Sequence, residues 1–183
     1  MSQVELDQVY ETLDSNVEYA NTIAKQTVDN QTADLDALMK GIYDEIISVE
    51  EPPTSSIEKY FLALSNCLYF LGESVEKVGL YDDLSKAQAK EKYNNAYMDS
   101  VNPINGKKVT VAEAQTSAEN AATYETMVNT IYARAYKMFK YKIDAAQTML
   151  SSLSKMVSKR MQDEQLASKD AIPDNVKKYL VEG

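Results

Sequence analysis

Seven cationic side chains between Ile131 and Arg160 are the residues of this chain best suited to binding a ligand, because only one acid, Asp144, lies among them. On a helix, with about 100° between successive residues, five of the cations and one tyrosine fall on a single outer face. These residues are Arg134, Lys137, Lys140, Tyr141, Lys155 and Lys159. Lysine and arginine interleaved with an aromatic ring suit the phosphates and bases of a single-stranded nucleic acid.

The same outer face has a second interpretation, because the chain as a whole is acidic. It carries 19 basic and 28 acidic side chains, for a net charge of -9. Four acids spaced three and four residues apart form a stripe on the first expected helix: Asp7, Glu11, Asp14 and Glu18. The outer cations are therefore either free to bind phosphate, solvated, or paired with this acidic stripe within a subunit or between neighbours.

Two further cations interrupt the apolar face of the basic helix. Lys142 and Arg160 are 18 residues apart, which is five helical turns, so they share one direction on the helix. Either their long stems cross an interface, or each pairs with a carboxylate from another element. We expect both residues, like the acidic stripe, to be structural or interfacial.

The composition excludes most enzyme classes. The chain has no histidine, which removes histidine-based triads and histidine-ligated metals, and it has a single cysteine. It contains neither GxGxxG nor GxxxxGK[ST], the glycine-rich loops that bind phosphate groups. We expect no catalytic activity, no cofactor and no metal. No apolar run is long enough to cross a membrane, and the N-terminus does not look like a signal peptide, so we expect an intracellular protein.

Apolar residues at spacings of three and four predict an all-α protein. Helices are expected over residues 2–28, 33–48, 56–78 and 82–97, with Gly79 as a cap and the apolar run YFLALSNCLYFL at the centre of the core. A turn or small hairpin follows in SVNPINGKKV, and Thr110 and Glu113 then form a capping box. The next helix would be about 80 Å long if unbroken. It must bend, break near residues 121–123 or pack along other chains.

These elements predict a helical bundle with one very long C-terminal helix, assembled as an oligomer. Four regions are expected along the chain. They are acidic N-terminal helices with the apolar core helix over 1–99, a linker over 100–109, the long helix over 110–166 and a C-terminal arm over 167–183.

The stretch ARAYKMFKYKIDAAQTMLSSLSKMVSKRM resembles the C-terminal region of the tailed-phage recombination mediator (UvsY-type) family. The matching positions are Lys142, Asp144, Ala145, Leu150, Leu153, Val157 and Arg160. The segment KEKYNNAY is similar to a tyrosine-containing helix upstream in that family. The resemblance implies a small, helical, non-enzymatic, ring-forming protein that binds single-stranded DNA and helps to load a recombinase.

Three functions therefore compete. The first is a phage-type homo-oligomer that binds single-stranded DNA and a recombinase in the host cytoplasm. The second is a virion or assembly protein, such as a neck, ring or capsid-associated component, whose basic helix meets acidic surfaces of other virion proteins. The third is a helical adaptor that presents its acidic N-terminal face to a basic partner.

Overall fold

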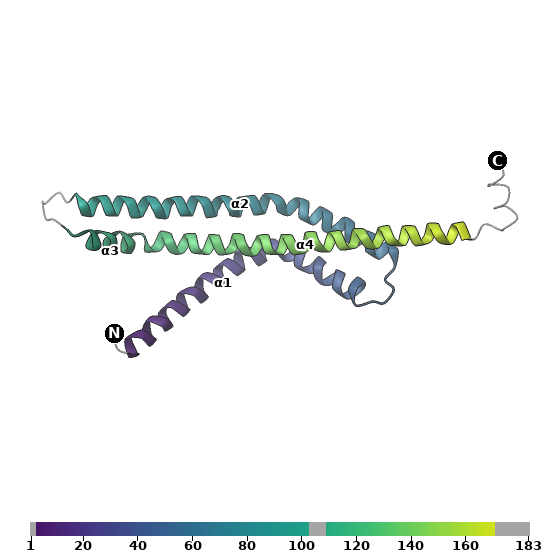
Figure 1. Ribbon diagram of the computed structural model, residues 1–183, viewed down its shortest axis with the longest axis horizontal. Helices are drawn as coiled ribbons and strands as arrows, with labels where there is room; N and C mark the ends of the chain where they lie inside the picture. Colours follow the sequence, from purple (N-terminus) through teal and green to yellow (C-terminus); the bar gives the residue numbers. More distant parts are fainter. Residues whose placement is uncertain (1–2, 103–108, 171–183) are drawn as a thin grey trace. The chain divides into compact units, whose positions relative to one another are not determined.

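The computed structural model describes the backbone of residues 3–102 and 109–170, and the side chains of 16–102 and 109–167. Every regular element in these ranges is helical, which confirms the all-α prediction (Figure 1). The helices are α1 (Gln3–Ile42), followed directly by a π-helical turn, η1 (Tyr43–Ile47), then α2 (Thr54–Val101), α3 (Val111–Ala121) and α4 (Thr123–Asp170).

The helices are longer than the sequence patterns predicted. Helix α1 continues through residues 29–32, where an end was expected, because Val28, Thr32 and Leu35 extend its buried stripe. Helix α2 continues through Gly79, which does not cap a helix. A Cβ atom at that position would lie 3.0 Å from Cε2 of Tyr136, so the glycine leaves room for the tyrosine ring. Its role is close packing rather than termination.

The expected break near residues 121–123 is present between α3 and α4. Ala122 caps α3 with its backbone N–H, which donates to the carbonyl oxygen of Ala118 at 3.0 Å. The capping box at the start of α3 is also confirmed. Glu113 N–H donates to Thr110 Oγ1 at 3.3 Å, and the Thr110 N–H donates to Glu113 Oε2 at 2.9 Å. This backbone donor holds the pKa of the Glu113 carboxyl below its usual value.

The described residues form two compact units. The first unit comprises α1 up to Ala33 with Phe70–Lys142, and the second comprises Asp34–Tyr69 with α4 from Ile143 onward. The long helices contribute to both units, so each unit contains segments that are distant in sequence.

Small side chains dominate the core of the first unit. Its fully or nearly fully buried hydrophobic residues are Ala20, Ala24, Val28, Leu71, Val78, Ala114, Ala118, Ala122, Ala135 and Phe139. Alanine lets helix backbones approach closely at little cost in side-chain entropy. Where α2 runs beside α4, the Asn129 amide donates to Ser85 Oγ and to Asp82 Oδ1, each at 3.2 Å (Figure 1). The packing and the hydrogen bonds together fix the register of these two helices.

The second unit has a core of larger aliphatic side chains. Its buried residues are Leu35, Ile42, Ile46, Ile57, Tyr60, Leu64, Ala146 and Leu153. The Tyr60 hydroxyl donates to Glu45 Oε1 at 2.7 Å, and this bond, with burial, raises the pKa of the phenol. Gly41 provides the space, because a Cβ atom there would lie 2.6 Å from the hydroxyl oxygen.

The apolar run of residues 60–71 does not lie wholly within the core. Tyr60, Leu64 and Leu71 are buried, whereas Leu62 and Tyr69 are exposed. One face of this segment packs and the other stays on the surface. The prediction that the whole run is central to the core was therefore wrong.

Lys142 joins α4 to α1 inside the first unit. Its Nζ lies 3.0 Å from Asp29 Oδ1 and 2.8 Å from Thr32 Oγ1, and Asp29 also pairs with Lys25 on α1. The hydrogen bonds from Lys25 and then Lys142 hold the pKa of the Asp29 carboxyl below its ordinary value. Of the two roles expected for Lys142, the ion pair with a carboxylate from another element is the one observed.

Replacing Asp29 by Asn should lower the free energy of unfolding by about 1 kcal/mol at pH 7, because two lysines lose an anionic partner. A carboxyl whose native pKa is lowered stabilises the fold above its unfolded pKa of about 3.9, and this stabilisation disappears as the pH falls through the native pKa. Urea unfolding at several pH values should show the two proteins converging in acid. Asp83→Asn, exposed on α2, is the matched control; equal losses in both variants would contradict the assignment.

Replacing Ala118 by Leu should destabilise the first unit by about 1–3 kcal/mol, because a buried alanine site has no room for three further carbon atoms. Ala121→Leu on the same helix adds the same atoms at an exposed position, and its free energy of unfolding should stay within about 0.5 kcal/mol of the wild type. Chemical denaturation monitored by circular dichroism measures both. Similar free energies of unfolding for the two variants would show that the packing around Ala118 has room for a larger side chain.

Candidate functional site

The predicted basic face of α4 is divided between the two units. Arg134, Lys137, Lys140 and Tyr141 belong to the first unit, and Lys155 and Lys159 belong to the second. We call the first four residues the upstream cluster. The structure brings these four together on two turns of one helix, and the two later lysines are considered separately.

The upstream cluster is exposed because the opposite side of α4 is anchored in the core. Ala135 and Phe139 are completely buried, whereas Arg134, Lys137 and Lys140 are exposed. The ring of Tyr141 is 75% exposed. Core packing therefore fixes the rotation of α4 about its axis and turns three cations and one aromatic ring toward solvent.

The cations of the upstream cluster are not neutralised by acids that the structure describes. No ion pair joins Arg134, Lys137 or Lys140 to any described carboxylate. Helix α4 itself contains no acid between Glu125 and Asp144. Lys142, which does pair with an acid, is part-buried and lies outside the cluster.

Lys140 is supported by an aromatic ring. Its Nζ lies 5.5 Å from the centroid of the Tyr136 ring, within the range of a cation–π contact. That ring is half-buried against Gly79 of α2. Gly79, Tyr136 and Lys140 thus form a stack, with the tyrosine ring between the glycine and the lysine. This stack could not be predicted from the residue pattern, because the glycine and the tyrosine are distant in the chain.

The acidic stripe is only partly described. The side chains of Asp7, Glu11 and Asp14 lie outside the described residues. Glu18 is exposed on α1 and forms no ion pair with a described residue. The acid that meets the basic helix in the first unit is Asp29, which does not belong to the predicted stripe.

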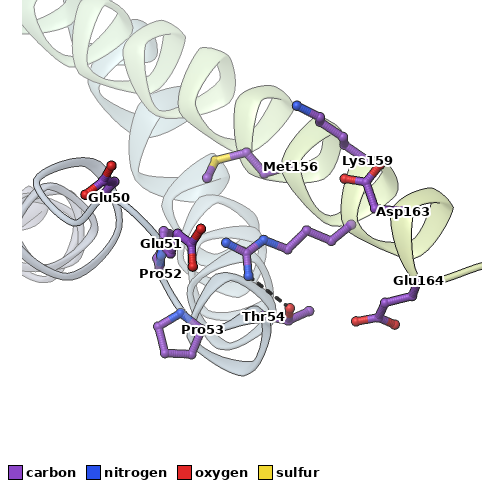
Figure 2. Close-up of a pocket in the computed structure, with 10 residues that line it drawn as sticks. Glu50, Glu51, Pro52, Pro53, Thr54, Met156, Lys159, Asp163 and Glu164 are labelled. Atoms are coloured by element: carbon purple, nitrogen blue, oxygen red, sulfur yellow. Dashed lines mark hydrogen bonds between the residues drawn. The ribbon is translucent and has the colours of Figure 1, made fainter. Parts of the chain in front are cut away.

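In the second unit, Lys155 is exposed, and Lys159 and Arg160 line a pocket of about 660 Å³ (Figure 2). Arg160 Nη1 donates to Thr54 Oγ1 at 3.3 Å. The same pocket is lined by four acids: Glu50, Glu51, Asp163 and Glu164. This environment was not predicted from the sequence, although Asp163 and Glu164 follow Arg160 by three and four residues, and Glu50 and Glu51 directly precede the two prolines at 52–53.

The acids of this pocket make it a poor phosphate site, because four carboxylates outnumber its two cations. Arg160, like Lys142, is part-buried and hydrogen-bonded to another element rather than displayed. The geometry therefore favours the upstream cluster over the later lysines as a site for an anionic ligand.

Other kinds of site find little support in the described residues. Within those residues, no group of three or more acidic or sulfur ligands is placed to hold a metal ion. None of the helices that the structure describes combines the length and apolar character needed to cross a membrane.

Comparisons of the chain with protein-family models, curated proteins and solved structures found no match.

Proposed function

We propose that this protein binds single-stranded DNA through the upstream cluster and acts without catalysis, as a helical accessory protein of phage-type recombination. The observation that carries the proposal is the exposure of Arg134, Lys137 and Lys140 beside the exposed ring of Tyr141, with no described acid paired to them. The role in recombination rests on the resemblance of residues 142–160 to mediator proteins. With this role we propose a recombinase as the protein partner and the host cytoplasm as the location.

The spacing of the cluster suits an extended strand. Arg134, Lys137 and Lys140 follow one another by three residues, so each lies about 4.5 Å further along the helix axis. Long, flexible side chains can contact successive phosphates from such positions without recognising bases. Tyr141 supplies a ring on which a base can stack, worth about 1–3 kcal/mol per base. Such binding is independent of sequence and strongly dependent on salt.

A second candidate function is that of a virion or assembly protein whose basic face meets an acidic protein surface. The exposed apolar side chains of the second unit support it, since Leu62, Tyr69 and Ile47 lie on the surface there. Exposed apolar residues that gather into patches commonly mark protein–protein contacts. This function predicts no affinity for DNA.

Fluorescence anisotropy with a labelled oligothymidylate separates the two candidates. The wild type should bind at about 50 mM salt, and Lys137→Glu/Lys140→Glu should bind much more weakly. Losing two phosphate contacts should also reduce the slope of log K against log salt by about 1.4, at about 0.7 per contact on a single strand. Tyr141→Ala should weaken binding and leave that slope nearly unchanged.

Lys86→Glu/Lys90→Glu is the matched control, because it changes the net charge equally at exposed positions of α2 in the same unit. This variant should retain most of the affinity. Absence of wild-type binding at low salt would refute DNA binding and favour the assembly function. Equal losses in the two double variants would attribute binding to overall charge rather than to the cluster.

A further inference from the structure

Within the first unit, helix α2 displays apolar residues on a face other than the one that packs. Val78 and Ser85 are buried against neighbouring helices. At about 100° per residue, Leu80 lies about 140–160° and Leu84 about 100–120° around the helix from these two residues. The two leucines are 56% and 50% exposed. A helix that buries one face against its own chain and displays leucines on another face is suited to a second helical partner.

The exposed stripe follows a seven-residue repeat. Positions 70, 77, 84, 91 and 98 are Phe70, Lys77, Leu84, Glu91 and Met98, and all five are exposed. A seven-residue spacing keeps side chains on one line of a helix that supercoils with a partner. Phe70 and Met98 are 75% and 56% exposed. The line thus has apolar ends, an apolar centre and two opposite charges between them.

This line is complementary to itself when reversed. Lys77 lies seven residues before Leu84 and Glu91 lies seven residues after it; Phe70 and Met98 lie fourteen residues before and after. A two-fold axis at Leu84 therefore places each lysine opposite a glutamate, each phenylalanine opposite a methionine, and leucine opposite leucine. In a two-fold interface, every such contact occurs twice.

A parallel arrangement lacks this complementarity. With the two helices in the same direction and in register, Lys77 would face Lys77 and Glu91 would face Glu91. Like charges directly opposed destabilise a helical pair, and e/g-type charge patterns commonly select orientation in this way.

We infer that α2 is a homodimer interface in which a second copy of this chain packs antiparallel along residues 70–98, with the two-fold axis near Leu84. The surface does not depend on DNA binding, because its residues are distinct from the upstream cluster on α4.

Sedimentation velocity over a concentration series tests the interface. The wild type should dimerise reversibly, and Leu84→Glu should remain monomeric, because it places two buried carboxylates against each other on the axis. Lys77→Glu and Glu91→Lys should each weaken self-association about tenfold, since each creates two like-charge pairs. The double variant Lys77→Glu/Glu91→Lys should recover the wild-type dissociation constant.

The recovery in the double variant is specific to the antiparallel arrangement, because exchanging both charges restores each opposite pair. In a parallel dimer, neither single change would matter. A wild-type protein that stays monomeric at all accessible concentrations would overturn the proposal, because the exposed residues of α2 would then not bind a second copy of the chain. A self-associating Leu84→Glu variant with wild-type helicity by circular dichroism would also overturn it, and so would a double variant no stronger than the singles.

Discussion

Each long helix of this protein can bury only one stripe of its surface, and the rest of the structure follows from that constraint. The chain has few glycines and prolines, so its helices run on for forty or more residues instead of folding back into many layers. Neighbouring helices cover only part of the surface of such a helix. The other sides must be compatible with water or with a partner, and they are where charged and exposed apolar residues gather.

The division of the basic residues of α4 illustrates the constraint. Packing of Ala135 and Phe139 sets the rotation of the helix, and this rotation decides which cations are displayed. Lys142 falls on the packed side and is compensated by Asp29 and Thr32. Arg134, Lys137 and Lys140 fall on the solvent side, where no described acid pairs with them. The same helix therefore carries a structural cation and the exposed cations proposed to bind a ligand, and the position of each residue on the helix decides which it is.

Much of the local architecture could be predicted from the sequence, because it depends on short-range chemistry. The capping box at Thr110 and Glu113, the break at Ala122 and the inward direction of Lys142 follow from residue types within a few turns. The continuity of α2 through Gly79 could not be foreseen, because the reason is the ring of Tyr136, far along the chain. The apolar run at residues 60–71 was also misjudged, since its composition does not say how many neighbours will cover it.

The candidate site shows the same limit. Helical periodicity was enough to separate outward cations from inward ones, and the exposures in the structure agree with that separation. The acids around Arg160 and the aromatic support beneath Lys140 depend on tertiary contacts that no periodicity reveals. These contacts distinguish the upstream cluster from the later lysines. Helical periodicity alone had placed both groups on one continuous face.

The alanine-rich core of the first unit also has a thermodynamic consequence. Alanine exposes little apolar surface on unfolding, and apolar exposure is what raises the heat capacity of the unfolded chain. The heat-capacity increment of this unit should therefore lie below the usual value of about 12–15 cal/mol/K per residue. A small increment flattens the dependence of stability on temperature. The stability of this unit should therefore change slowly on heating or cooling.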